Sequence, residues 1–235
     1  MPTVAAFHLL RVFAGVDGHG GNPLAVFLEG GQVAPAARQR TATEVGLSET
    51  VFVDDARRGE IAIYTPAVEL DFAGHPSVGT AWLLAREHGS APVLRPPAGE
   101  VPARADAEGA FVAARPEWGP PFEWEQLEAA ADVDALDGPP HGHDLIGAWA
   151  WLDEAAGSVR ARVFTARLGM DEDEATGAAA TKLCARLRRP IDIRQGVASQ
   201  ILARPRDDGR VEVGGRVELD EVRAYSPSSD TKRSS

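Results

Sequence analysis

The sequence predicts an α+β fold of two similar lobes, each with a curved, mostly antiparallel sheet around one central helix. Short segments that alternate apolar and polar residues outnumber segments with helical spacing, which favours antiparallel sheet. The chain also resembles itself at a spacing of 100 residues. Each copy runs from a strand through an acidic, glycine-containing loop into an alanine-rich helix, so each lobe should contain one such unit.

A few matching positions carry this internal repeat. The corresponding pairs are Tyr64-Thr65 with Phe164-Thr165, Asp71 with Asp171, Leu83 with Leu183, Ala85 with Ala185 and Arg86 with Arg186. We therefore expect an N-terminal lobe over 1–115, a C-terminal lobe over 116–218, and a return strand and mobile tail over 219–235. The two loop–helix junctions should face a shared cleft.

Periodicity and turn residues predict the elements in order along the chain. Pro35 near the start and Gly46 just past the end define a first helix over 35–45. Further helices are expected over 77–87, 122–131 and 176–187. Strands are expected over 7–13, 24–28, 50–53, 60–64, 145–152, 159–165, 197–203, 210–213 and 217–225, with short strand-like runs between 90 and 115.

Composition excludes several classes of protein. The 235 residues are 44% hydrophobic, enough for a sizeable core, and the net charge of −11 opposes binding to nucleic-acid phosphates. No apolar run reaches the roughly 18 residues of a membrane span, and the N-terminus lacks a signal-peptide pattern. Cys184 is the single cysteine. We therefore expect a cytoplasmic protein without nucleic-acid or membrane partners.

Three segments contain residues suited to chemistry. Segment 46–53 places Glu49 at the mouth of an apolar strand. Segment 69–77 opens a helix with a Gly-His-Pro sequence that contains His75, and segment 169–178 opens the equivalent helix with an acidic loop. Because helix N-termini expose unpaired N–H groups and partial positive charge, two such ends facing one cleft would bind a carboxylate.

Individual side chains suit proton transfer. Desolvation of Glu49 would favour its protonated form, so this carboxyl could act as both general base and general acid. A helix N-terminus disfavours imidazolium, so His75 should be neutral. Asp173 lies among three other acids, whose repulsion would help it hold a proton. Gly74 and Gly177 would let a ligand approach the backbone closely.

Each of these residues also has a purely structural explanation. Glu49 at a strand start can be a solvated charge. His75 can simply cap its helix, and acids before Thr176 stabilise a helix dipole without any catalytic role. The occurrence of all three segments together, in this order, favours the functional interpretation.

Six motifs occur in order along the chain. They are Arg11-Val12-Phe13, Gly21-Asn22-Pro23-Leu24-Ala25-Val26, Leu47-Ser48-Glu49-Thr50, Gly74-His75-Pro76, Glu172-Asp173-Glu174-Ala175-Thr176-Gly177-Ala178-Ala179 and Gln195-Gly196. With these motifs the chain resembles the PhzF-like proteins, named after phenazine biosynthesis, which have the diaminopimelate-epimerase type of fold. The resemblance runs from about residue 7 to about residue 219.

This resemblance implies isomerisation without a cofactor. The carboxyl matching Glu49 would move a proton between ring carbons of a dihydro-hydroxyanthranilate, assisted by the residues matching His75 and Asp173. The resemblance also implies a homodimer and a role in secondary metabolism. The residues implied to bind the substrate and its carboxylate are Asn22, Gly74, Thr176, Gly177 and Ala178.

The chain departs from the family at several positions. Glu174 and Ala178 replace a Pro and a Ser, and Asp71 replaces a usual Pro. We expect an isomerase acting on a small unsaturated, carboxylate-bearing, amino-acid-like metabolite. One alternative is a catalytically altered metabolite-binding or assembly protein of the same fold, and another is bond cleavage or epimerisation on this scaffold.

Other candidate features carry less information. Racemases of this fold need two thiols, whereas Cys184 is alone inside a predicted helix and suits the core. The run His141-Gly142-His143-Asp144 could suggest a metal site, but such a cluster in a Pro/Gly loop is more often solvated. We therefore expect no metal.

Overall fold

The computed structural model describes residues 5–91 and 93–227. The strands are β1 (Ala5–Ala14), β2 (Asn22–Phe27), β3 (Glu49–Asp55), β4 (Glu60–Tyr64), β5 (Glu69–Leu70), β6 (Ala103–Asp106), β7 (Gly109–Ala114), β8 (Glu123–Gln126), β9 (Ile146–Asp153), β10 (Ser158–Thr165), β11 (Met170–Asp173), β12 (Ile191–Gln195), β13 (Ser199–Pro205) and β14 (Val211–Tyr225). The α-helices are α1 (Pro35–Val45), α2 (Gly74–His88), α3 (Ala130–Asp134) and α4 (Gly177–Leu187). Short 3-10 helices are η1 (Gly30–Gln32), η2 (Pro116–Trp118), η3 (Pro140–Gly142) and η4 (Ala166–Leu168).

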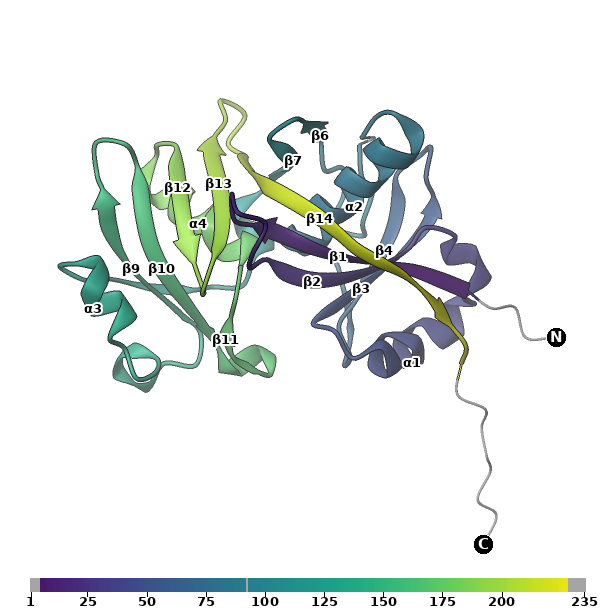
Figure 1. Cartoon of the computed structure of the whole chain (residues 1–235), viewed down its shortest axis with the longest axis horizontal. Coiled ribbons are helices and arrows are strands. Elements are labelled where there is room, and N and C mark those ends of the chain that lie inside the picture. The colour runs from purple at the N-terminus through teal and green to yellow at the C-terminus, as the bar shows by residue number, and fades with distance from the viewer. Residues whose placement is uncertain (1–4, 92, 228–235) are drawn as a thin grey trace, which may run out of the picture.

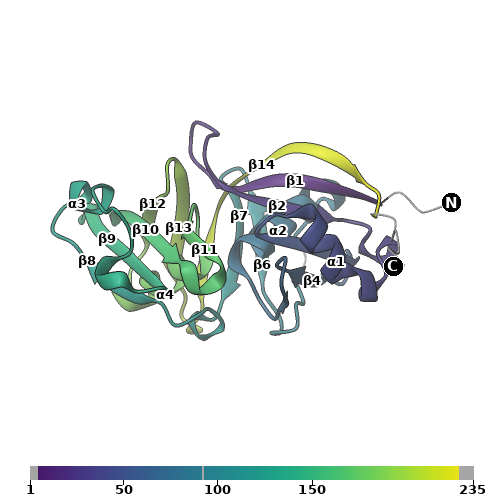
Figure 2. The ribbon, with the colours of Figure 1, turned by 90° about the horizontal axis from the view of Figure 1, so that it is seen from below.

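One long strand joins the two lobes of this α+β fold. The main hydrogen-bonded strand order is β5-β4-β3-β2-β1-β14-β13-β12-β10-β9-β8. The first part of β14 pairs with β13 and β7, and its later part pairs antiparallel with β1. Figure 1 shows β14 running from the junction of the lobes across the N-terminal lobe, and Figure 2 shows the two lobes side by side with β14 arching over the N-terminal one. Pairing is mostly antiparallel, with parallel neighbours at β2–β3, β8–β9 and β10–β12.

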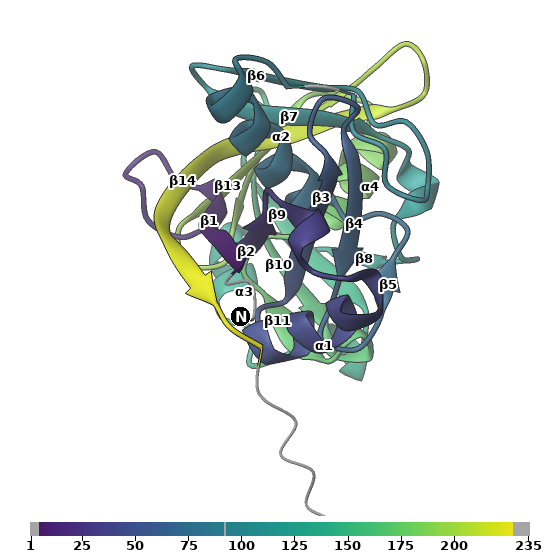
Figure 3. The same ribbon diagram turned by 90° about the vertical axis from the view of Figure 1, so that its right-hand side faces the viewer.

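The N-terminal lobe is built around α2. This helix packs against strands on several sides, namely β1, β2, β3, β6, β7 and β14. Its side chains Val78, Leu83 and Leu84 have no exposed surface. A second apolar layer lies under α1, where the rings of Phe27 and Phe52 stack with centroids 4.9 Å apart. Figure 3 shows α2 enclosed by strands, with α1 on the outside.

The C-terminal lobe repeats this arrangement around α4. The helix packs against β13, β14 and η2, and buries Leu183 and Cys184 completely. In both lobes a longer strand pairs antiparallel with a short strand that leads into the central helix, β4 with β5 before α2 and β10 with β11 before α4. These pairs correspond to the internal sequence repeat.

Several predicted elements need correction. The helix expected over 122–131 is wrong: this region forms β8 and then the short α3. Trp124 lies directly over Gly147 of the neighbouring β9, so burial of this ring favours the extended backbone over helical propensity. β5, β11 and β12 lie outside the strands expected from the sequence, and the strands expected over 210–213 and 217–225 are one continuous strand, β14.

The lobe boundaries at 115 and 218 stay a prediction, since β14 runs without interruption across position 218. Part of the tail expected to be mobile, 228–235, lies outside the described residues. Among the described helices, none has the length and apolar character needed to span a membrane.

Candidate active site

The first turns of α2 and α4 meet where the two lobes join. Gly74 opens α2 and Gly177 opens α4. A Cβ atom on Gly74 would lie 3.1 Å from the Cα atom of Gly177, and one on Gly177 would lie 3.2 Å from the backbone nitrogen of His75. Glycine at both positions therefore allows the two helix starts to approach closely, which brings two sets of unpaired N–H groups together. Ala178 follows in the first turn of α4.

Glu49 and His75 face each other beside this junction. Glu49 is the first residue of β3, and His75 is the second residue of α2. The Glu49 Oε2 and His75 Nε2 atoms are 3.4 Å apart, and the side chains are only 17% and 6% exposed. Neither atom has an aligned hydrogen-bond partner among the residues that the structure describes. Unsatisfied buried polar atoms are costly, and they cluster where a ligand completes the hydrogen bonding.

Asp173 lies at the end of β11 in a fully connected polar network. Asn22 Nδ2 donates to Asp173 Oδ1 at 2.6 Å, and the hydroxyl of Thr176 donates to Asp173 Oδ2 at 2.7 Å. The side-chain amide of Gln195 donates to the backbone oxygen of Asp173 at 2.8 Å and to the hydroxyl of Thr176 at 2.9 Å. Asn22 comes from the N-terminal lobe, so this network crosses between the lobes.

Burial raises the pKa of the Asp173 carboxyl above its ordinary value. The nearby His75 and the hydrogen bonds from Thr176 and Asn22 oppose this rise in pKa, while the charge of Glu49 adds to it. The expected repulsion within the acidic loop is thus not the main cause. Glu172 instead pairs with Arg162 at 2.6 Å, and Glu174 binds the turn after β12. The structure therefore brings Glu49, His75 and Asp173 into one electrostatically coupled group.

The site residues expected from the sequence all lie at this junction. Ala178 has no polar side chain and contributes only backbone atoms, in the first turn of α4. Gln195 is not among the site residues expected from the sequence, although it contacts both Asp173 and Thr176. Its signal was present in the Gln195-Gly196 motif, but nothing in the local pattern shows that the amide reaches Asp173 and Thr176. Long-range contacts of this kind depend on the complete fold.

The other candidate features have structural explanations. His141 and His143 contact Glu125 and Glu123 at 3.3 Å and 3.1 Å. No group of three or more His, Cys, Asp or Glu side chains suited to a metal ion occurs within residues 5–91 and 93–227. Burial raises the pKa of the Cys184 thiol to about 12, which keeps it protonated and unreactive.

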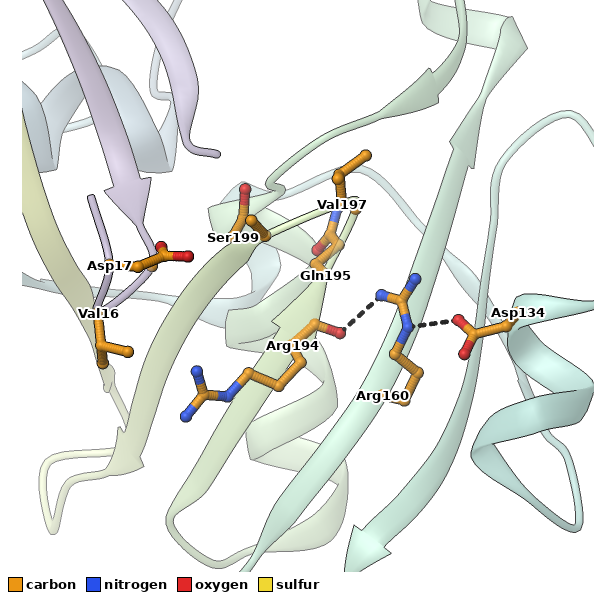
Figure 4. A pocket seen from close by; sticks show the side chains of 11 residues that line it. Val16, Asp17, Asp134, Arg160, Arg194, Gln195, Val197 and Ser199 are labelled. Carbon is orange, nitrogen blue, oxygen red and sulfur yellow. Dashed lines mark hydrogen bonds and ion pairs between the residues drawn. The ribbon is translucent and has the colours of Figure 1, made fainter. Parts of the chain in front are cut away.

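Two cavities, of about 450 and 550 Å³, adjoin the segment after β12. Figure 4 shows the first cavity, with Val16 and Asp17 on one side and Arg160 and Arg194 on the other. Arg160 pairs with Asp134 at 2.7 Å, so its charge is already compensated. Gln195 lines this cavity as well as binding Asp173.

Comparison with known proteins agrees with the motifs and the fold. A family model described as phenazine biosynthesis-like protein (PhzC-PhzF) matches residues 10–138. The trans-2,3-dihydro-3-hydroxyanthranilate isomerase of Pseudomonas fluorescens is 32% identical over 254 residues, which cover 85% of this chain and 89% of that protein.

Solved structures show the same fold. The Bacillus anthracis phenazine biosynthesis protein of the PhzF family superposes with a TM-score of 0.75 at 17% identity, covering 96% of this chain and all (100%) of that one. A hydroxyproline epimerase from Agrobacterium vitis superposes with a TM-score of 0.61 at 12% identity, covering 94% and 92% of the two chains. The α+β fold expected from the sequence is confirmed. The chain belongs to the phenazine biosynthesis-like (PhzF) family and is an isomerase of that family.

Proposed function

We propose that this isomerase moves a proton within a small unsaturated, carboxylate-bearing, amino-acid-like metabolite, with trans-2,3-dihydro-3-hydroxyanthranilate as the first candidate. The observation that carries this proposal is the pair of buried, unpartnered atoms, Glu49 Oε2 and His75 Nε2, beside two helix N-termini. The full-length similarity to the Pseudomonas fluorescens isomerase supports the choice of candidate.

Glu49 is the proton-transferring group in this proposal. As a carboxylate it would remove a proton from one substrate carbon, while the electron pair of the broken C–H bond moves along the conjugated system. As a carboxylic acid it would then return a proton to a different carbon, so that a double bond shifts without oxidation or reduction. A carboxyl suits both steps because the same oxygen can accept a proton and later donate it, and Glu49 is held beside His75 in a largely buried place.

His75 and Asp173 assist this transfer. His75 contacts Glu49 from the start of α2, and its imidazole can donate or accept a hydrogen bond there. Asp173, with its raised pKa, can hold a proton and act as a hydrogen-bond donor to a polar substrate group. The hydroxyl of Thr176 and the amide of Asn22 fix its orientation.

The paired helix starts supply the site for the substrate carboxylate. Backbone N–H groups at Gly74, Gly177 and Ala178 belong to the first turns of α2 and α4 and lack intrahelical partners. Two helix dipoles at one place favour negative charge, each by about 0.3–1 kcal/mol at an exposed site and more where water is excluded. An alanine at 178 leaves carboxylate binding at this position to the backbone alone.

Assembly and location complete the proposal. We expect a homodimer that acts in the cytoplasm, without cofactor or metal. The single, buried Cys184 is consistent with a reducing compartment.

Turnover of trans-2,3-dihydro-3-hydroxyanthranilate by the purified chain tests the proposal. Glu49→Gln keeps the shape of the side chain and removes its proton-transfer capacity, so we expect kcat to fall by about 10²- to 10⁴-fold. Glu87→Gln at the exposed end of α2 is the matched control and should leave turnover unchanged. Full activity in Glu49→Gln would refute the assignment of Glu49. Saturable ligand binding by the wild type without turnover would favour the metabolite-binding alternative.

A further inference from the structure

Glu174 follows Asp173 directly in the chain but binds a different part of the molecule. The backbone N–H of Val197 donates to Glu174 Oε1 at 3.0 Å and to Oε2 at 3.1 Å. The N–H of Ala198 donates to Oε1 at 3.4 Å, and the hydroxyl of Ser199 donates to Oε1 at 2.7 Å. The turn 196–199 thus holds the Glu174 carboxylate as a small anion-binding nest. Glycine suits position 196, because its φ of +57° lies in the left-handed region and a Cβ atom there would displace this carboxylate.

Ser199 connects the Glu174 carboxylate to the N-terminal lobe. The N–H of Gly21 donates to Ser199 Oγ at 2.8 Å, while the same hydroxyl donates to Glu174. The loop between β1 and β2 also packs against the turn backbone to backbone, since a Cβ on Gly20 would lie 2.8 Å from the nitrogen of Ser199. One carboxylate therefore links three segments from two lobes.

On each of these three segments, the residue next to the Glu174 contact belongs to the hydrogen-bond network of Asp173. Gly21 precedes Asn22, which donates to Asp173 Oδ1. Glu174 follows Asp173. Gln195, which binds the backbone of Asp173, directly precedes the turn 196–199. Any movement that separates Glu174 from the turn would consequently shift the donors that orient Asp173.

The turn also borders the two cavities. Gly196 and Val197 line both cavities, and Glu174 lines the larger one. Figure 4 shows Ser199 and Gln195 at the wall of the first cavity, facing the loop that contains Asp17. Asp173, whose backbone oxygen accepts from Gln195 just before the turn, is only 8% exposed. We therefore expect the contacts that hold the turn in place to help keep Asp173 buried.

We propose that Glu174 is a positioning residue: its carboxylate fastens the turn 196–199 and, through Ser199, the glycine loop of the N-terminal lobe, so that the lobes stay closed around Asp173. The relevance to catalysis rests on the proposed function, whereas the interaction between the lobes does not. Glu174 acts through its neighbours and does not itself reach the reacting atoms.

Amide hydrogen exchange of the substrate-free protein, measured by NMR, tests the link. Glu174→Ala and Ser199→Ala should each speed exchange at Gly21 by about tenfold or more, because a hydrogen bond involving a charged group is lost and the loop opens. Glu172→Gln is the matched control: its carboxylate pairs with Arg162 inside the C-terminal lobe, and exchange at Gly21 should stay as in the wild type. Faster exchange at Val197 alone in Glu174→Ala, with Gly21 unchanged, would overturn the proposal. Should Glu174→Ala fail to fold, Glu174→Gln provides the same comparison with the side-chain shape retained.

A second measurement, the titration of Asp173, tests the positioning role. Ser199→Ala changes no charge, so ¹³C NMR titration of the Asp173 carboxyl reports only on its surroundings. We expect the Asp173 pKa to move down toward its ordinary value as water gains access. An unchanged Asp173 titration in Ser199→Ala would refute positioning even if exchange at Gly21 increases.

Ser199→Ala should also lower kcat/KM by about tenfold relative to Glu172→Gln, which corresponds to loss of one such hydrogen bond. If exchange and titration respond but the wild type turns over no candidate substrate, the proposed function fails and the positioning role stands.

Discussion

At the residue scale, some buried polar atoms of the site have hydrogen-bond partners and others do not. Asp173 has its hydrogen bonds satisfied by Asn22 and Thr176, whereas the facing atoms of Glu49 and His75 are unpartnered. A satisfied group is held in place, and an unsatisfied pair gains from binding a ligand. This difference supports a fixed hydrogen-bonding group at Asp173 and a reacting pair at Glu49 and His75.

The motifs predict that Glu49, His75 and Asp173 act together, and the structure places these three residues near one another. Their environment was harder to predict. Repulsion by neighbouring acids was the expected cause of protonation at Asp173, but burial is the larger cause, and the neighbours pair elsewhere. Side-chain direction in an acidic loop depends on distant partners such as Arg162, which the local sequence does not reveal.

The raised pKa of Asp173 makes its contribution to stability dependent on pH. The native carboxyl keeps its proton to higher pH than the unfolded chain, whose Asp has the ordinary value of 3.8. The native state therefore binds more protons in this window, and the free energy of unfolding falls as pH rises from about 3.8 through the native pKa of Asp173.

Asp173→Asn removes this titration. We expect the free energy of unfolding of the wild type, minus that of Asp173→Asn, to fall between about pH 3.8 and the native pKa of Asp173. At higher pH this difference should stay constant. Urea denaturation at a series of pH values measures the difference, with Asp171→Asn on the same strand as the control. A wild-type-minus-variant difference that does not change with pH would contradict the burial of Asp173.

At the element scale, the site is produced by the close contact of two helix starts. Gly74 and Gly177 permit this contact because neither helix carries a Cβ atom there. The sequence predicts both helices and both glycines, but the helix expected over 77–87 begins three residues earlier in the structure, at Gly74 of α2. Pro76 is tolerated in a first helical turn, where its missing N–H has no intrahelical partner.

Gly177→Ala tests the helix contact. The added methyl group would lie 3.2 Å from the backbone nitrogen of His75, closer than an ordinary contact. We expect the free energy of unfolding to fall by about 1–3 kcal/mol, the usual range for overpacking. Gly31→Ala, at an exposed position with no atom within 4 Å of the new methyl group, should be near neutral. Equal stability of the two variants in urea denaturation would show that the helix starts do not touch.

Four short strands, β5, β8, β11 and β12, lie outside the strands that the sequence predicts. β5 and β11 have only two and four residues, too few to show an alternating pattern. β8 and β12 each have a parallel neighbour, β9 and β10, that is distant in the chain, so no hairpin turn marks that pairing. Antiparallel strands and helices with glycine ends, such as α1 ending at Gly46, were predicted well.

At the scale of the whole molecule, the two lobes form one continuous structure. β14 pairs with β13 in one lobe and with β1 in the other, and one apolar cluster contains Ile63 of the first lobe and Ile193 of the second. The internal repeat predicted two similar units. It could not predict that a single strand, β14, would join them.

This continuity predicts cooperative unfolding. Ile63→Val and Ile193→Val are matched substitutions at buried positions in β4 and β12. Each should lower the free energy of unfolding of the same single transition by about 0.5–1.5 kcal/mol. Tryptophan fluorescence and far-ultraviolet circular dichroism should give coincident urea curves. Two separate transitions, each shifted by only one of the substitutions, would mean that the lobes unfold independently.

The transfer of a proton by Glu49 is the central claim, and solvent deuterium incorporation tests it most directly. The wild type and Glu49→Gln would each be incubated in heavy water with trans-2,3-dihydro-3-hydroxyanthranilate and a panel of unsaturated cyclic amino acids, followed by NMR. We predict that the wild type places deuterium on a carbon of at least one compound as its double bond shifts, and that Glu49→Gln does not. Equal incorporation by the wild type and the folded variant would contradict the claim, because the proton would then be carried by another group.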